Sequence, residues 1–178
     1  MVQRKTRRPA SGESGSEATV AARRPASRIL IVEARFYEDI ADMLVEGAIA
    51  ELEAQGCSYD RVSVPGALEI PQVLGSVAAA GLAPMTASAG RFAGVIVLGC
   101  VIRGETSHYD IVVNNANHWL MQVAIQHNIP VGNGILTVDT DKQAKARARG
   151  GRDGKGGDAA RACLALVDLA RQFQGLAV

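Results

Sequence analysis

The residues best suited to chemistry gather in one polar segment, 99–110, which reads GCVIRGETSHYD. It follows a continuous apolar run, 92–98, and precedes a long stretch with helical periodicity. Thr106 and Ser107 would lie near the N-terminus of that helix, where backbone N–H groups and hydroxyls favour an anion. His108 lies at the same point. An imidazole is the side chain most often used for proton transfer, although capping the helix is the alternative role of His108.

Cys100 ends the apolar run and has two interpretations. A thiolate there, paired with His108, would suit a cysteine-dependent hydrolase. A small buried side chain is the better interpretation, because the residue directly ends an apolar strand. His118 and His127 are weaker candidates for a functional site. His118 would lie on a different helix face from His108, and His127 lies at a helix end, where a cation is favoured by the helix dipole. No His, Cys and Asp spacing resembles a metal site, so no metal ion is expected.

Two other segments follow predicted strands and carry candidate binding residues. Phe36 and Tyr37 come soon after the apolar run 29–32, and their rings could stack on a planar ligand or pack on the next helix. Glu69 follows the sharp Pro65-Gly66 turn. Its carboxylate suits either the dipole of a helix start or the hydroxyl groups of a ligand.

Basic residues near the C-terminal third offer an anion site. Arg147 could reach a phosphate or carboxylate, whereas Arg149 is better explained as part of a solvated face. The Gly-rich stretch 150–157 invites comparison with a phosphate-binding P-loop. The stretch does not match that motif. The motif requires Gly at position 149, where this chain has Arg, and Ser or Thr after Lys155, where this chain has Gly. Nucleotide hydrolysis by that route is therefore not expected.

Strands and helices are expected to alternate along the chain. The expected strands are 29–32, 59–64, 92–98 and 130–137, and the expected helices lie around 38–52, 69–81, 109–127, 139–149 and 158–174. Apolar strands joined by crossover helices predict a parallel sheet covered on both faces. The predicted fold is α/β: a three-layer αβα sandwich of the flavodoxin-like type with a four-stranded parallel sheet. Ligands of such sheets bind beyond the carboxyl ends of the strands.

Composition and charge narrow the class of protein. The chain has 178 residues, of which 48% are hydrophobic, and this excludes a wholly disordered chain. A net charge of +1 makes a nucleic-acid partner unexpected. No apolar run reaches about 18 residues, so no membrane span is expected.

The first 27 residues differ from the rest. They hold six Lys and Arg against two Glu, a net charge of +4, and the remainder has a net charge of −3. Without apolar periodicity, residues 1–27 are expected to form a disordered basic tail before one domain, 28–178. Arg7-Arg8 is not followed by an apolar stretch, so an export signal is not expected. The three cysteines are therefore expected to be reduced thiols in the cytoplasm.

Five blocks of the sequence resemble the lumazine synthase family, in that family's order. They are EARFY (33–37), VPGALEIP (64–71), GCVIRGETSHYDIV (99–112), GNGILTVDTDKQAKARA (132–148) and GKGGDAA (154–160). The resemblance runs from about Arg28 to the C-terminus. The second and third blocks together are the most specific.

The resemblance implies a transferase of riboflavin biosynthesis. It would condense 5-amino-6-(D-ribitylamino)uracil with 3,4-dihydroxy-2-butanone 4-phosphate to 6,7-dimethyl-8-ribityllumazine, phosphate and water, the penultimate step of that pathway. It also implies that no metal or organic cofactor is used. The amine attacks the ketone to give an imine, phosphate is eliminated and the ring closes. Because both substrates are reactive, such a protein needs orientation, anion binding and a proton shuttle more than a nucleophile.

The resemblance also implies roles for residues at matching positions. Phe36 would stack on the pyrimidinedione, Glu69 would accept hydrogen bonds from the ribityl hydroxyls, and His108 would be the proton donor. Arg147 would bind the phosphate together with the turn at Glu105 and Thr106. The other implied substrate-binding residues are Ala67, Leu68, Cys100, Val101, Ile102, Asn133 and Lys155.

Three positions depart from the family's usual pattern. Asn133 replaces an aromatic residue contributed by a neighbouring subunit, Tyr37 replaces a common Asn, and Leu68 replaces a common Phe. An Asn cannot close the pocket by stacking, so weaker pyrimidine binding is expected. The resemblance implies a homo-oligomer, either a pentamer or a pentamer-based assembly, with the site between neighbours. A non-catalytic flavin or lumazine binder on the same scaffold is the alternative function.

Overall fold

One parallel sheet organises the protein. The computed structural model describes residues 27–83 and 90–175, so the expected tail lies outside the described residues except for Ser27, which is buried. The described strands form a four-stranded sheet in the order β2-β1-β3-β4, and every neighbouring pair is parallel. They are β1 (Arg28–Ala34), β2 (Ser58–Val64), β3 (Gly94–Ile102) and β4 (Val131–Val138).

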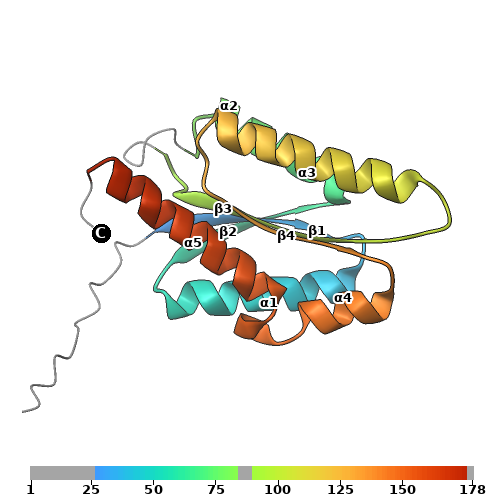
Figure 1. Ribbon diagram of the computed structural model, residues 1–178. Helices are drawn as coiled ribbons and strands as arrows, with labels where there is room; N and C mark the ends of the chain where they lie inside the picture. Colours follow the sequence, from blue (N-terminus) through green and yellow to red (C-terminus); the bar gives the residue numbers. More distant parts are fainter. Residues whose placement is uncertain (1–26, 84–89, 176–178) are drawn as a thin grey trace, which may run out of the picture.

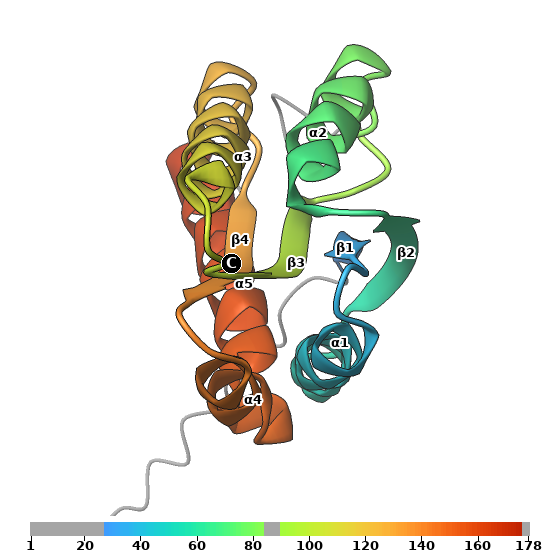
Figure 2. The same cartoon turned by 90° about the vertical axis from the view of Figure 1, so that its right-hand side faces the viewer.

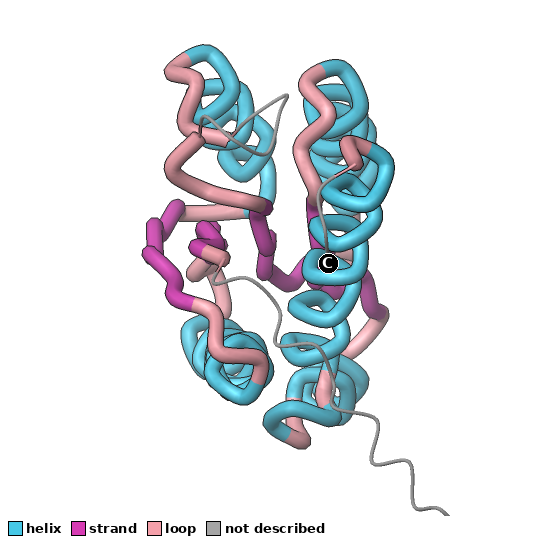
Figure 3. The backbone as a smooth tube through the Cα atoms, turned by 90° about the vertical axis from the view of Figure 1, so that its left-hand side faces the viewer, coloured by secondary structure: helices cyan, strands magenta, loops and turns pink. Residues whose placement is uncertain are grey.

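Helices cover both faces of the sheet, as Figures 1 and 2 show. One layer holds α1 (Glu38–Ala54), α4 (Asp141–Ala148) and α5 (Lys155–Phe173), and the other holds α2 (Ile70–Ala79) and α3 (His108–Gln126). Short 3₁₀ turns, η1 (Ala67–Glu69) and η2 (Gly151–Asp153), precede α2 and α5. Figure 3 shows the strands lying between the two layers. The predicted three-layer flavodoxin-like fold is confirmed.

Alternating side chains of the central strands build a core on each face. Ile29 and Ile31 pack on the layer with α1, whereas Leu30 and Val32 pack on the layer with α2. All four are at most 2% exposed. This double burial explains why the central strands are continuous apolar runs rather than alternating ones. None of the helices in the described part of the chain is long and apolar enough to cross a bilayer.

Two boundaries differ from the predicted ones by more than two residues. The strand expected at 92–98 is β3, which runs on to Ile102, because its parallel pairing with β4 continues from Gly99 to the end. The helix expected at 158–174 already begins at Lys155. Gly156 lies inside it, and a Cβ there would overlap the carbonyl oxygen of Leu44 on α1. Glycine therefore serves close helix packing there rather than a chain break.

A buried carboxylate ties α1 to the start of α5. Glu51 is 0% exposed, and its Oε2 accepts hydrogen bonds from Arg152 Nε and Arg161 Nη1, each at 3.0 Å. Its Oε1 accepts a hydrogen bond from Gln55 at 2.9 Å. Burial alone would raise the pKa of Glu51, but the hydrogen bonds from Gln55 and the two arginines hold it below its usual value. The charged form is thus the one that the fold stabilises.

Replacing Glu51 with Gln is expected to lower the free energy of unfolding by about 2–4 kcal/mol near pH 7, because the neutral amide removes the charge that pairs with both arginines and turns an NH2 donor towards the Gln55 donor. The pKa of Glu51 is lower in the folded chain than in the unfolded one. Its contribution is therefore full above the unfolded value of about 4.3 and is lost as the pH falls through the folded pKa. Denaturant unfolding of both proteins at neutral and acidic pH measures this.

Glu53→Gln is the matched control, because Glu53 is exposed and lies on the same helix. Its effect is expected to stay within about 0.5 kcal/mol. Equal effects of the two substitutions would contradict the assigned role of Glu51.

Candidate functional site

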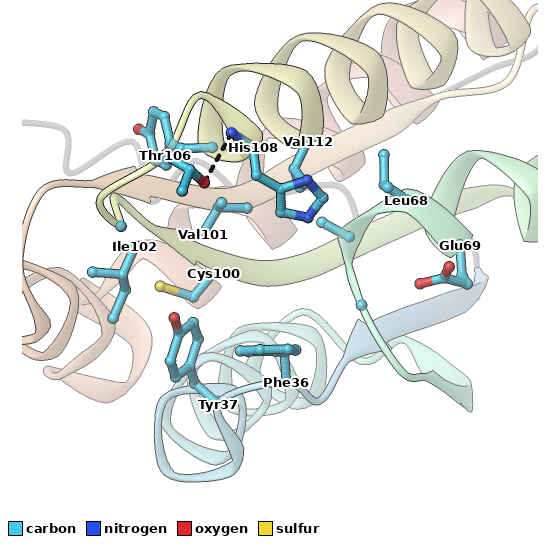
Figure 4. Close-up of a pocket in the computed structure, with 14 residues that line it drawn as sticks. Phe36, Tyr37, Leu68, Glu69, Cys100, Val101, Ile102, Thr106, His108 and Val112 are labelled. Carbon is cyan, nitrogen blue, oxygen red and sulfur yellow. Dashed lines mark hydrogen bonds between the residues drawn. The ribbon is translucent and has the colours of Figure 1, made fainter.

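A pocket of about 280 Å³ opens at the carboxyl ends of β1 and β3 (Figure 4). This is the edge at which parallel α/β sheets bind ligands. Segments from four parts of the chain surround the pocket. Its lining residues are Phe36, Tyr37, Gly66, Ala67, Leu68, Glu69, Cys100, Val101, Ile102, Gly104, Thr106, His108, Tyr109 and Val112.

Two aromatic rings from the turn between β1 and α1 form one wall. Phe36 is 72% exposed, so one face of its ring is open to a ligand. Tyr37 is half-buried against the core, and the two rings meet edge to face with centroids 4.9 Å apart. Tyr37 therefore anchors the pair while Phe36 presents a stacking surface. This geometry favours the stacking interpretation of Phe36 over packing onto α1.

The turn after β2 and the short η1 helix form the opposite wall. Ala67 and Leu68 supply apolar surface, and Glu69 adds a half-buried carboxylate. Among the described residues, none gives that carboxylate a hydrogen bond or an ion pair. A Cβ on Gly66 would lie 3.2 Å from Glu69 Oε2, so glycine leaves room for the carboxylate. Glu69 is thus free to accept hydrogen bonds from ligand hydroxyls.

The end of β3 forms the floor of the pocket. Cys100 is 8% exposed, and Figure 4 shows its Sγ pointing away from the imidazole of His108. Burial raises the pKa of the Cys100 thiol to about 11, and the carboxylates of Asp141 and Asp39 act in the same direction. The thiol is therefore protonated near neutral pH. This environment opposes a thiolate nucleophile and favours the interpretation of Cys100 as a small buried residue.

The first turn of α3 completes the pocket. The backbone N–H of His108 donates a hydrogen bond to Thr106 Oγ1 at 3.4 Å, drawn as a dashed line in Figure 4. The hydroxyl proton of Thr106 remains available to a ligand. The imidazole of His108 points into the pocket between Val112 and Leu68. The imidazole thus faces the pocket instead of capping the helix.

Four residues that sequence analysis placed in the site lie outside this pocket: Glu105, Asn133, Arg147 and Lys155. Arg147 is exposed, and its Nη1 donates only to the carbonyl oxygen of Gln143, at 3.3 Å. Lys155 pairs with Asp158 at 2.7 Å. The amide of Asn133 is held by Asn117, at 2.8 Å, and by the backbone N–H of Ile135. Glu105 is exposed on the turn that precedes α3.

Some lining residues escaped the sequence analysis. Tyr109 and Val112 follow His108 by one and four residues, so helical spacing could have placed Val112 beside the imidazole. Tyr37 was predicted to stack or to pack with Phe36 but was not named as a substrate-binding residue, and Gly66 and Gly104 have no side chain that could suggest a binding role. The described residues contain no group of three or more His, Cys, Asp and Glu able to hold a metal ion.

Comparison with known proteins gives one consistent result. The family model of 6,7-dimethyl-8-ribityllumazine synthase matches residues 26–171. The protein of that name from Nitrobacter hamburgensis is 51% identical over 147 residues, which span 83% of this chain and 88% of that one. The namesake from Agrobacterium fabrum is 48% identical over 147 residues, 83% of this chain and 97% of its own. With most of the chain matched and the pocket formed by the blocks that resemble this family, the protein belongs to the 6,7-dimethyl-8-ribityllumazine synthase family.

Proposed function

We propose that the protein catalyses the condensation of 5-amino-6-(D-ribitylamino)uracil with 3,4-dihydroxy-2-butanone 4-phosphate to 6,7-dimethyl-8-ribityllumazine. The observation that supports this best is the convergence of three groups on one pocket. They are the exposed ring of Phe36, the unpaired carboxylate of Glu69 and the imidazole of His108. The direct test is to mix the purified protein with both substrates and follow lumazine formation by its absorbance.

The pyrimidine fits the wall formed by Phe36 and Tyr37. Its planar ring would lie against the open face of Phe36, and its polar edge would meet the backbone at the end of β3. The ribityl hydroxyls would donate to Glu69 across the pocket. In this orientation the 5-amino group faces the first turn of α3, where the second substrate would bind.

The butanone phosphate fits the other end of the pocket. Its phosphate would meet the N-terminus of α3 and the hydroxyl of Thr106, both of which favour an anion. Holding the ketone beside the amine supplies the orientation that imine formation needs. His108 would donate a proton to the ketone oxygen, which leaves as water when the imine forms, and would take one back as phosphate is eliminated. Ring closure by the ribityl-bearing nitrogen on the remaining carbonyl then releases a second water.

The pocket of a single chain lacks part of this machinery. Arg147 and Lys155 lie outside it, and Arg147 has no carboxylate partner among the described residues. We propose that a second copy of the chain supplies Asn133, Arg147 and Lys155 to the pocket of its neighbour, in a pentamer or a pentamer-based assembly of the cytoplasm. The basic tail, 1–27, is proposed to lie outside this catalytic unit.

A non-catalytic lumazine or flavin binder is the alternative function. Such a protein would use Phe36 and Glu69 but would not need a proton-transferring group aimed into the pocket. The orientation of His108 therefore favours the enzyme. A protein that binds the lumazine but forms none from the two substrates would establish the binder instead.

His108→Ala is expected to lower kcat by about 10²-fold, because a positioned acid–base group typically contributes about 10²–10⁴-fold. The value lies at the low end since the substrates also react spontaneously. Substrate binding should change little. Steady-state kinetics between pH 6 and 8 measure this, and an unchanged kcat over that range would show that His108 is not the proton shuttle.

Arg147→Ala is expected to raise KM for the butanone phosphate by roughly tenfold or more and to leave KM for the pyrimidine nearly unchanged. Losing a hydrogen bond to a charged group costs about 1.5–3 kcal/mol, and about 1.4 kcal/mol corresponds to tenfold. Arg149→Ala is the matched control, because Arg149 is also exposed and directly follows the same helix. A larger effect of Arg149→Ala would move the anion site by half a helical turn.

Cys100→Ala is expected to retain most activity, since the raised pKa keeps its thiol protonated and the residue packs against the core. Initial rates of the variant and the parent, together with sedimentation to verify assembly, measure this. Complete loss of activity in a still-assembled variant would revive the cysteine-dependent mechanism.

A further inference from the structure

We propose that Arg103 is a positioning residue for the anion-binding turn, 103–108, and that it acts through Tyr109 rather than by touching the phosphate. The inference rests on the proposed function, since it assigns how that site is held in shape. Arg103 directly follows β3, and its backbone N–H donates to the carbonyl oxygen of Val138, at 2.9 Å. The pairing of β3 with β4 therefore fixes where the turn begins.

The side chain of Arg103 folds across the turn to the helix that follows it. Its guanidinium carbon lies 4.0 Å from the centroid of the Tyr109 ring, a close cation–π contact. Its Nη1 also donates to Asp110 Oδ1 at 3.3 Å, and its Nε donates to Asp139 Oδ1 at 3.3 Å. One planar group thus joins the first turn of α3 to the segment after β4.

The turn has little else to hold it. Every residue from Gly104 to His108 is exposed. The described residues of this stretch make one hydrogen bond that involves a side chain, from the His108 N–H to Thr106 Oγ1, and at 3.4 Å it is long. An exposed segment with so few contacts samples several conformations unless a neighbour restrains it. The contacts of Arg103 supply that restraint from both ends.

Arg103 is poorly suited to bind the phosphate itself. Its guanidinium already faces two carboxylates, Asp110 and Asp139, which balance its charge, and one of its faces covers Tyr109. It does not line the pocket, whereas Tyr109, the ring beneath it, does. Each ion pair is solvent-exposed and weak by itself. Together the two ion pairs hold the guanidinium of Arg103 in one orientation over the ring of Tyr109.

Loosening this arrangement should weaken anion binding before it affects the rest of the site. The hydroxyl of Thr106 and the N–H groups of the first turn of α3 must point to one place to hold a phosphate. A displacement of about 1 Å in such a constellation costs up to about 10²-fold. The pyrimidine lies against Phe36, on another wall, and should be bound nearly as before.

The experiment compares Arg103→Met, Arg103→Lys and Tyr109→Leu in the full-length protein. Inorganic phosphate is the probe, its dissociation constant is measured by calorimetry, and steady-state kinetics accompany it. Arg103→Met is expected to weaken phosphate binding by about tenfold and to raise KM for the butanone phosphate similarly. KM for the pyrimidine should change by less than about twofold. General damage to the fold would move both KM values.

The other two variants separate positioning from charge. Arg103→Lys keeps the charge but lacks the planar fork, so it should recover only part of the phosphate affinity. Tyr109→Leu should weaken phosphate binding in the same direction. The double variant, Arg103→Met with Tyr109→Leu, should lose little more than the worse single variant, because both changes break the same contact.

Arg91→Met is the matched control. Arg91 is also an exposed arginine that pairs with an aspartate, Asp60, and lies over an aromatic ring, Phe92, at 5.4 Å. It lies away from the candidate pocket, so its loss removes the same kinds of contact without touching the turn. Phosphate binding and both KM values are expected to stay at the parent's level.

Three results would overturn the proposal. Phosphate binding in Arg103→Met that equals the parent's would show that the turn needs no support from Arg103. Full recovery in Arg103→Lys would show that only the charge matters. Abolished binding in Arg103→Met with intact binding in Tyr109→Leu would make Arg103 a direct phosphate ligand. Calorimetry measures phosphate binding without turnover. If the parent protein formed no lumazine, the proposed function would be refuted, but the comparison of phosphate binding among the variants would still test the role of Arg103.

Discussion

The site depends on the parallel alignment of β1 and β3 at the centre of the sheet. Their register sets Val32 beside Val97 and Glu33 beside Leu98, so both strands deliver their carboxyl ends to the same edge. The aromatic turn after β1 and the polar turn after β3 then face one another across a short distance. Because both strands are buried between the helical layers, their side chains are mostly apolar, and the one buried charge in β1, Glu33, is paired with Arg35 and Arg61.

This constraint also explains the chemistry that the pocket favours. The floor at the end of β3 is still close to the core, so the Cys100 thiol is desolvated and its pKa is raised to about 11. The groups able to exchange protons or accept hydrogen bonds, His108 and Glu69, come from the surrounding turns instead. Such a site is suited to orienting and protonating reactive partners. It offers no thiolate for covalent catalysis, and an amine that attacks a ketone needs none.

Sequence patterns predicted the fold well, because buried parallel strands leave continuous apolar runs such as 29–32. The sequence patterns gave wrong boundaries where a neighbouring strand or helix determines the conformation of a segment. β3 continues past Leu98 because β4 offers it backbone hydrogen bonds, and no local pattern records that pairing. Gly156 was expected to lie before the last helix, at 158–174, yet it lies within α5, where the backbone of α1 leaves no room for a side chain.

The candidate site was predicted in part for a similar reason. Residues in contiguous blocks, from Ala67 to Glu69 and from Cys100 to Ile102, do come together at the pocket. Arg147 was predicted as an anion ligand from its charge and position and from the family resemblance, but a single chain leaves it on the surface. The support that Arg103 gives to Tyr109 was not predicted, because the direction of a long side chain across a turn is not encoded in spacing.

The charge balance of the pocket is the strongest physical argument for the proposed assembly. The described residues that line the pocket include no Lys or Arg. The N-terminus of α3 contributes the equivalent of about +0.5 charge, whereas a phosphate monoester carries about −1.5 to −2. Arg103 cannot cover the difference, since Asp110 and Asp139 already balance it. If the butanone phosphate binds as proposed, a further cation beside the pocket would help to balance its charge, and in the proposed assembly the exposed Arg147 of a second copy would supply it.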